Sequence, residues 1–221
     1  MKNVLILGAG SGIGKALLDS LSKKKDTFVL GVSRSGEEYA GELQSGKNYR
    51  KDITLDYTFD FLKSLKSLDA VYITLGNGLF KPFEKITKEE WEAHLLLNLT
   101  APFLALQNLI PYLKQSPSPF VCFLSSTAGK QGFPESSAYC ASKHGIAGLA
   151  KALREEWKPK VRVFTVYPGA ISTPIWEGRD GFSPEDMIRP EDFAKYLEGF
   201  LDLDPRINIE ESIVLPPKGI L

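Results

Sequence analysis

Tyr139 and Lys143 are the residues of this 221-residue chain whose types and spacing best suit acid/base chemistry. Residues four positions apart in a helix lie on the same face, one turn from each other. An ammonium beside a phenol favours the phenolate and lowers the tyrosine pKa from its usual value of about 10. Such a tyrosine can exchange a proton with a substrate. Because this spacing often arises by chance, the pair needs support from its surroundings.

Ser125 and Ser126 provide part of that support. They follow the apolar run from Phe120 to Leu124, which predicts a buried strand with both hydroxyls at its carboxyl end. Open α/β sheets bind their ligands at the carboxyl ends of strands. The two serines are therefore candidates for contact with a ligand.

A glycine-rich segment follows the first apolar run of the chain, Val4 to Leu7, and opens an expected helix. Its residues are Gly8, Gly10, Ser11, Gly12, Ile13 and Gly14. Small residues let the backbone approach a pyrophosphate, and the start of a helix offers free N–H groups and a positive dipole. The spacing is Gly-x-x-x-Gly-x-Gly rather than the commoner GxGxxG. A plain tight turn is the alternative, but the place between strand and helix favours a dinucleotide site.

The second apolar run ends at Ser33 and Arg34, where dinucleotide-binding folds usually place an acid for the ribose hydroxyls. No carboxylate stands there, and an arginine can bind a 2′-phosphate. This favours NADP(H), with NAD(H) still possible. The alternative is that Arg34 is a solvated loop residue.

The elements that must position these residues alternate along the chain. Strand-like runs cover 4–7, 27–32, 70–75, 120–124, 161–167 and 213–215, and helical patterns cover 14–21, 88–113, 137–157 and 191–203. The alternation predicts an α/β Rossmann-like, doubly wound parallel sheet of about seven strands, with helices on both faces in three layers. No linker is marked, so residues 1–221 are expected to form a single domain that carries both cofactor and catalytic residues. Segment 174–190, rich in proline and glycine, is the expected substrate lid.

Composition narrows the classes of protein. Hydrophobic residues make up 43% and charged residues 24%, which is ordinary globular composition. Lys plus Arg equal Asp plus Glu at 27 each, so no basic excess favours nucleic acid. Two cysteines, Cys122 and Cys140, form no disulfide framework, which favours a reducing, cytoplasmic setting. Polar residues interrupt the apolar window 95–113, so no membrane partner is expected, and His94 and His144 lack companions for a metal.

Together with further segments, these motifs resemble the short-chain dehydrogenase/reductase family over essentially the whole chain. Residues 7–14 are similar to its TGxxxGIG loop, with Leu7 in place of the usual threonine. Ser126, Tyr139 and Lys143 match its catalytic serine and YxxxK motif, and Asn98 matches its fourth catalytic position. Asp52 and Ile53 resemble the adenine-binding aspartate and the residue after it. The segment with Pro168, Gly169, Ile171 and Thr173 is similar to the PGxIxTP stretch along the nicotinamide.

The resemblance implies hydride transfer between a nicotinamide and a small carbonyl or alcohol substrate. It implies that Ser126 hydrogen-bonds the substrate oxygen and that Tyr139 donates the proton during reduction. Lys143 would hold the nicotinamide ribose and depress the Tyr139 pKa, and Asn98 would hold a water linking Lys143 to solvent. Ser126 as a strand-end cap and Asn98 as a polar kink remain alternatives. Ser125 is a minor rival to Ser126, and Cys140 is expected to be a buried thiol without a catalytic role.

The chain departs from the family pattern in two places. Ile73-Thr74-Leu75-Gly76 stands where members usually show NNAG, so contacts of Thr74 and Gly76 with the adenosine half are expected to be altered. The segment after Thr173 is short, which predicts a compact lid. Both features motivate an alternative, a dinucleotide-binding regulator or sensor without redox turnover. The intact Ser126, Tyr139 and Lys143 favour the enzyme, and glycine spacing and length disfavour a nucleotide-sugar epimerase or dehydratase.

Two expectations concern surfaces. By resemblance, the helices at 88–113 and 137–157 form the interface of a homodimer or homotetramer. Apolar side chains that either line a substrate pocket or pack the lid onto the domain are Leu79, Phe80, Phe133, Trp176, Phe182 and Met187.

Overall fold

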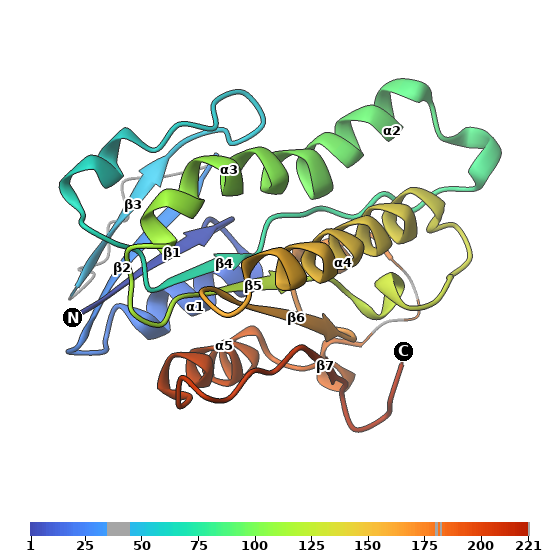
Figure 1. Cartoon of the computed structure of the whole chain (residues 1–221). Helices are drawn as coiled ribbons and strands as arrows, with labels where there is room; N and C mark the ends of the chain where they lie inside the picture. Colours follow the sequence, from blue (N-terminus) through green and yellow to red (C-terminus); the bar gives the residue numbers. More distant parts are fainter. Residues whose placement is uncertain (35–44, 180, 182, 221) are drawn as a thin grey trace.

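A computed structural model describes residues 1–34, 45–179, 181 and 183–220. Within them, one fully parallel sheet has the strand order β3-β2-β1-β4-β5-β6-β7 (Figure 1). The strands are β1 (Lys2–Leu7), β2 (Thr27–Ser33), β3 (Gly46–Arg50), β4 (Ala70–Ile73), β5 (Phe120–Leu124), β6 (Arg162–Pro168) and β7 (Glu211–Val214). The main helices are α1 (Gly12–Leu21), α2 (Lys88–Leu95), α3 (Ala101–Leu113), α4 (Ser137–Trp157) and α5 (Pro190–Glu198). The expected α/β doubly wound fold is confirmed.

Helices cover both faces of the sheet. Helices α2, α3 and α4 lie on one face, and α1 and α5 lie on the other (Figure 1). A hydrophobic core lies on each face of the sheet, and successive residues of β1 point into different cores. Leu5 packs in the core with α3 and α4, and Ile6 packs in the core with α1 and α5. A strand covered on both faces needs apolar residues at every position. This is why Val4 to Leu7 is a continuous apolar run.

The sheet changes direction between β1 and β4. From β1 the chain moves outward through β2 and β3, and then it crosses back to β4 and continues outward on the other side to β7. A crevice opens at the carboxyl ends of neighbouring strands at such a switch point. The glycine segment follows β1 and therefore lies in that crevice.

The structure corrects several predicted boundaries. The sequence analysis missed β3, because Gly46 to Arg50 is a polar strand at the edge of the sheet without an apolar run. The strand expected at 70–75 ends at Ile73. The helix expected at 191–203 is α5 followed by a 3₁₀ turn, Gly199–Asp202.

The helix expected at 88–113 is interrupted. A π-helical segment, Leu96–Thr100, joins α2 to α3 and contains Asn98. By length and composition, this stretch is the one helical candidate for a membrane span within the described chain, with a mean hydropathy of 1.3 and 44% of its most apolar window buried. Leu106, Leu109 and Leu113 of α3 pack in the core above the sheet. A core helix has the same length and composition, so the match is weak support for a span.

Candidate active site

A cleft of about 1120 Å³ runs along the carboxyl ends of the strands. It brings together nearly all of the predicted site residues, which come from seven separate stretches of the chain. Those that line it are Gly8, Gly10, Ser11, Gly12, Ile13, Gly14, Ser33, Arg34, Ile53, Thr74, Gly76, Ser126, Tyr139, Lys143, Pro168, Gly169, Ile171 and Thr173. Asp52 and Asn98 are not among the lining residues.

The glycine turn has no room for side chains at its two ends. A Cβ on Gly14 would lie 2.1 Å from the Gly8 carbonyl oxygen, far inside van der Waals contact. Gly8 has φ +100° and Gly12 has φ +49°, conformations that favour glycine. A Cβ on Gly12 would also lie 3.1 Å from the Thr173 methyl carbon. The turn is therefore closely packed against itself and against the segment after β6.

Thr74, which stands where the family usually has asparagine, is built into this turn. Its hydroxyl donates to the Leu7 carbonyl oxygen at 2.8 Å, and its backbone N–H donates to the same oxygen at 2.9 Å. A Cβ on Gly14 would lie 2.5 Å from the Thr74 hydroxyl oxygen. The departure from NNAG thus leaves a side chain that ties the loop after β4 to the end of β1.

The end of the cleft at the glycine turn suits an anionic dinucleotide. The first N–H groups of α1 have no carbonyl partner within the helix, and the Ser11 side chain does not cap them. Ser33 at the end of β2 is buried, and its hydroxyl oxygen has no partner among the described residues. Exposed Arg34 and half-buried Lys51 line the same end. Free N–H groups, a hydroxyl and two cations fit a pyrophosphate and a further phosphate.

Asp52 lies just beyond this end. Its carboxylate accepts from the Thr54 backbone N–H at 2.9 Å and from the Thr54 hydroxyl at 2.6 Å. These bonds, with a smaller contribution from the charge of Arg34, hold the pKa of Asp52 below its usual value. The carboxylate caps the turn after β3, and the buried Ile53 reaches the cleft.

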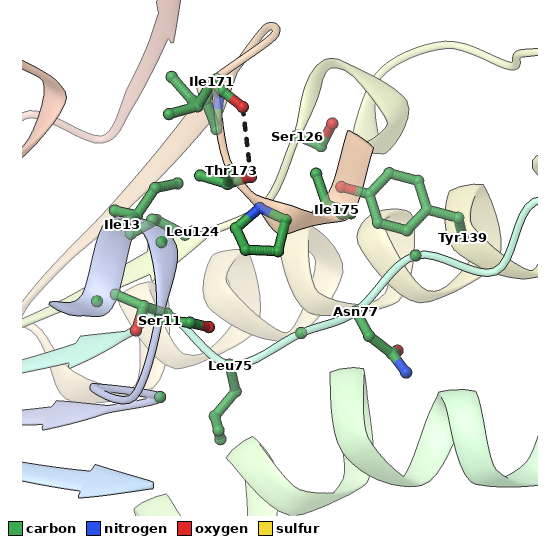
Figure 2. A pocket seen from close by; sticks show the side chains of 18 of the residues that line it. Ser11, Ile13, Leu75, Asn77, Leu124, Ser126, Tyr139, Ile171, Thr173 and Ile175 are labelled. Carbon is green, nitrogen blue, oxygen red and sulfur yellow. Dashed lines mark hydrogen bonds between the residues drawn. The ribbon is translucent and has the colours of Figure 1, made fainter. Parts of the chain in front are cut away.

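Ser126 and Tyr139 meet in the middle of the cleft. Ser126 follows β5, and its hydroxyl oxygen accepts from the Ala128 backbone N–H at 3.1 Å. Tyr139 comes from the first turn of α4, and its hydroxyl points toward Ile175 on the opposite wall (Figure 2). Burial raises the pKa of Tyr139, while a hydrogen bond with Ser126 and the charge of Arg179 lower it less. Tyr139 is therefore a neutral phenol at neutral pH.

Lys143 does not act on Tyr139 as the sequence predicted. Its Nζ lies 5.6 Å from the centre of the Tyr139 ring and donates to the Leu124 carbonyl oxygen at 3.1 Å. Burial lowers the pKa of Lys143 itself to about 8. Desolvation by the surrounding protein thus dominates both groups, and the expected depression of the Tyr139 pKa is wrong for this structure.

The two serines after β5 have different surroundings. The Ser125 hydroxyl is 3% exposed and donates to the Lys143 carbonyl oxygen at 2.9 Å, where it fastens α4 to the strand end. The Ser126 hydroxyl faces the cleft beside Tyr139 (Figure 2). The geometry favours Ser126 over Ser125 for contact with a substrate.

Asn98 lies behind the cleft wall. Its Oδ1 accepts from the Asn77 N–H at 3.1 Å, and its Nδ2 donates to the Asn77 carbonyl oxygen at 3.0 Å. Gly76, with φ +151°, lines the cleft next to this amide, since a Cβ there would lie 3.3 Å from Lys143 Nζ and 3.5 Å from Asn98 Oδ1. The alternative that Asn98 is only a polar residue at a helix kink is therefore disfavoured, since its side chain hydrogen-bonds the loop after β4 beside Lys143.

The opposite end of the cleft is aromatic. Phe80 lies 5.2 Å from Tyr139 between ring centres, and the Arg179 guanidinium lies 3.9 Å above Phe80 and 5.0 Å from Trp176. Phe133 also lines the cleft. Of the other apolar candidates, Leu79 and buried Met187 do not line it, and Phe182 lies outside the described residues.

The expected lid begins in the cleft wall. Pro174 to Arg179 line the cleft, and the chain then returns to the body of the protein at Ile188. There Ile188 pairs with Ile171 in an isolated parallel bridge, and its N–H donates to the Ala170 carbonyl oxygen at 3.0 Å. The segment is thus anchored at both ends.

Sequence reasoning missed several residues of the site and its support. They are Lys51, Asn77, His94, Ser136, Ser142 and Arg179. Ser142 directly precedes Lys143 in α4, and His94 precedes Asn98 by about one helical turn, so sequence spacing was an available signal for these two. In the parts of the chain that the structure describes, no group of three or more His, Cys, Asp or Glu residues could hold a metal.

The family model for short chain dehydrogenase matches residues 2–181 of the chain. The protein therefore belongs to the short-chain dehydrogenase family and is an oxidoreductase that acts on alcohol or carbonyl groups. This confirms the resemblance on which the site residues were predicted.

Individual relatives are similar over almost their whole length. Sepiapterin reductase of Chlorobaculum tepidum is 28% identical over 240 residues, which cover 99% of this chain and 98% of that protein. Levodione reductase of Leifsonia aquatica is 27% identical, with 95% of this chain and 82% of that protein covered. An alcohol dehydrogenase from Thermococcus sibiricus, solved with 5-hydroxy-NADP, shares the fold with a TM-score of 0.87 at 24% identity, covering 97% of this chain and 96% of that one.

Proposed function

We propose that the protein transfers hydride between NADP(H) and a small carbonyl or alcohol, with Tyr139 as the acid/base residue. The observation that carries the proposal is one shared cleft. The glycine turn lines one end, and Ser126 and Tyr139 line the middle beside Lys143. A proton donor next to a dinucleotide cradle is the arrangement that carbonyl reduction requires.

Each of the three residues has a defined task. The Ser126 hydroxyl donates a hydrogen bond to the substrate oxygen and places it beside Tyr139. The Tyr139 hydroxyl donates its proton to that oxygen as the carbonyl becomes an alcohol, and burial keeps the phenol protonated until then. Bound NADP(H) supplies or accepts the hydride. Lys143, with a pKa of about 8, carries a positive charge at neutral pH and hydrogen-bonds the nicotinamide ribose. Its charge stabilises the negative charge that forms on Tyr139 when the proton leaves.

The preference for NADP(H) rests on the end of β2. Arg34 and Lys51 line the cleft there, and Ser33 offers a buried hydroxyl. Among the described residues that line this end, none carries a carboxylate for a ribose hydroxyl. The dehydrogenase of Thermococcus sibiricus, bound to an NADP derivative, supports the same choice. NAD(H) would lose the phosphate contacts of both cations.

Titration with NADPH and NADH tests this preference through the fluorescence of Trp176, which lines the cleft. NADPH is expected to bind at least tenfold tighter, a difference of about 1.4 kcal/mol. Arg34→Ala should remove most of that difference, and Arg50→Ala, at an exposed arginine outside the cleft lining, should keep it. Equal affinity for NADPH and NADH in the wild type would contradict the assignment.

A regulator or sensor with the same fold is the second candidate, motivated by the altered loop at Thr74 and Gly76. The structure weakens the argument for a sensor, because the Thr74 side chain packs into the glycine turn. The discriminating assay follows NADPH absorbance with a panel of aliphatic, aromatic and cyclic ketones and aldehydes. Oxidation of NADPH with any of them eliminates the sensor, and binding of NADPH without oxidation across the panel favours it.

Domain organisation and assembly belong to the same proposal. Residues 1–221 act as one domain whose 174–190 lid closes over the substrate, in a cytoplasmic homodimer or homotetramer. Exposed Trp91 on α2 and Phe103 on α3 support an interface on this face. Sedimentation velocity of the wild type, and of the double variant Trp91→Glu with Phe103→Glu, tests it. The wild type should sediment as a dimer or tetramer and the variant as a smaller species.

A further inference from the structure

His94 is a buried histidine beside the catalytic cluster that the family motifs do not assign. It lies in the last turn of α2, is 3% exposed, and its ring lies 6.2 Å from the Tyr139 ring between centres. Its Nε2 lies 3.2 Å from the Ser142 hydroxyl oxygen and 3.1 Å from Asn98 Nδ2. Ser142 precedes Lys143, so His94 touches two residues next to the reacting groups.

The orientation of the Asn98 amide follows from the Asn77 backbone. The N–H of Asn77 needs an acceptor and its carbonyl oxygen needs a donor, so Oδ1 faces the first and Nδ2 faces the second. Nδ2 therefore has one hydrogen left, which points toward Ser142 and His94. Any group that contacts this hydrogen helps to fix the amide that holds the loop beside Lys143.

Ser142 is the junction of the cluster. Its hydroxyl donates to the Tyr139 carbonyl oxygen at 2.8 Å, so its oxygen can only accept from its other neighbours. Asn98 Nδ2 donates to it at 3.2 Å, and a hydrogen on His94 Nε2 would be the second donor at 3.2 Å. With both donors present, the hydroxyl uses its whole hydrogen-bonding capacity.

The other ring nitrogen of His94 settles the tautomer. Nδ1 is buried without a partner among the described residues, and an unpaired N–H would cost more there than an unpaired lone pair. The hydrogen of the neutral ring therefore lies on Nε2. Burial, with the nearby charge of Lys143, lowers the pKa of His94 to about 4, so the ring is neutral at physiological pH.

The local backbone explains why such a cluster is needed. Asn98 lies in the π-helical segment, where the regular hydrogen-bond pattern of the α-helix is interrupted. The Asn98 amide donates to the Ser142 hydroxyl of α4, and His94 of α2 donates to the same hydroxyl. Side chains of two neighbouring helices thus hold the amide through Ser142.

We propose that His94 is a positioning residue for the reaction: through Ser142 and Asn98 it fixes the loop at Gly76 and the catalytic turn of α4 relative to each other. The proposal rests on the proposed function, since the groups so placed are Tyr139 and Lys143. His94 itself is not among the residues that line the cleft.

Substitution at His94 separates positioning from packing. His94→Phe keeps the ring volume and removes both nitrogens, whereas His94→Gln restores a polar hydrogen near the place of Nε2. His144→Phe, at an exposed histidine of α4, is the matched control. We expect His94→Phe to lower kcat about tenfold or more with the NADPH Kd within about twofold, because misplacement rather than lost binding is the defect. His94→Gln should recover kcat to within about threefold of the wild type.

A second readout needs no turnover. In ¹⁵N-labelled protein, hydrogen exchange of the Asn98 side-chain amide, assigned by its loss in Asn98→Asp, should be slow in the wild type and in His94→Gln and fast in His94→Phe. Exchange that stays slow in His94→Phe, or a folded His94→Phe with wild-type kcat, overturns the proposal. Failure of His94→Gln to recover either readout, when its thermal melting matches the wild type, overturns it too. A wild type that oxidises NADPH with no compound of the panel refutes the proposed function instead, and the exchange experiment still decides the role of His94.

Discussion

The two ends of the cleft are held in place by different means. At the glycine turn, backbone packs on backbone: Gly14 has no space for a methyl group beside Gly8, and Thr74 ties the neighbouring loop to β1. At the aromatic end, side chains make the contacts, with the Arg179 guanidinium between Phe80 and Trp176. The first end therefore leaves little freedom for substitution, and the second can change residue by residue.

The two ends are therefore expected to have different tasks, cofactor binding at the glycine turn and substrate selection at the aromatic end. A cradle made of N–H groups and glycines binds a phosphate whatever the substrate is. A wall of exchangeable side chains decides which carbonyl compound fits. Ser126, Tyr139 and Lys143, the proposed catalytic residues, line the same cleft.

The largest expected effect is at the glycine turn. Gly14→Ala should abolish NADPH binding and lower the free energy of unfolding by about 3 kcal/mol or more, because the new methyl group meets backbone that cannot move aside. Urea unfolding and the fluorescence titration measure both quantities. The control is Gly148→Ala, at a glycine of α4 with nothing within 4 Å of a Cβ, where alanine should stabilise by up to about 1 kcal/mol. Wild-type NADPH affinity in Gly14→Ala would contradict the claim that the glycine turn tolerates little substitution.

Acidification should reveal the support behind the catalytic centre. The pKa of His94 is about 4 in the folded protein, against 6.5 for an exposed histidine, so the folded state binds fewer protons between these limits. Stability from this group is present above pH 6.5 and is lost as the pH falls toward 4, by about 3 kcal/mol in total. The free energy of unfolding of the wild type minus that of His94→Gln should fall by this amount between pH 7 and pH 4. A difference that stays constant with pH would contradict the buried neutral ring.

Lys143→Met should abolish turnover and raise the free energy of unfolding. Burial lowers the Lys143 pKa from 10.5 to about 8, which costs the folded state about 3 kcal/mol below pH 8. The substitution also removes the hydrogen bond from Lys143 to the Leu124 carbonyl oxygen. The free energy of unfolding without cofactor is therefore expected to rise by about 2 kcal/mol at pH 7. The gain should shrink as the pH rises from 8 to 10.5, and turnover should be lost. Lys151→Met, at an exposed lysine on the same helix, should change stability by less than about 0.5 kcal/mol.

The smallest effect is expected at the aromatic end. Arg179→Ala removes the cation–π contacts with Phe80 and Trp176, each worth about 0.5–1 kcal/mol. The substrate KM should rise about threefold to tenfold while the NADPH Kd stays within about twofold. Arg189→Ala, at an exposed arginine paired with Asp192, is the control. An equal loss of NADPH affinity in Arg179→Ala would show that the two ends are not independent.

The features predicted best from the sequence are those that depend on the local backbone, namely the strands and the glycine turn. Continuous apolar runs gave most of the strands, and glycine spacing gave the cradle, because both follow from steric limits that are local in the chain. Sequence reasoning missed β3, whose polar residues Gly46 to Arg50 pair at an exposed edge. It also joined α2 to α3, because the π-helical turn at Asn98 depends on contacts with Asn77 and Ser142, which lie far away in the sequence.

The same limit applies to electrostatics. The spacing of Tyr139 and Lys143 correctly placed both on one side of α4, but it predicted a lowered tyrosine pKa. Burial reverses that direction, and burial depends on how the loop at Phe80 and the segment at Ile175 cover the ring. Such coverage is a property of the folded chain and has no signature at the helix itself.

The most direct test of the account is a comparison of the wild type with Tyr139→Phe. NADPH affinity should be unchanged within about twofold, while NADPH oxidation with the best carbonyl substrate of the panel should fall by about a thousandfold or more, because the proton donor is gone and the cradle is intact. Turnover by Tyr139→Phe at a rate near that of the wild type would contradict the assignment of Tyr139 as the acid/base residue.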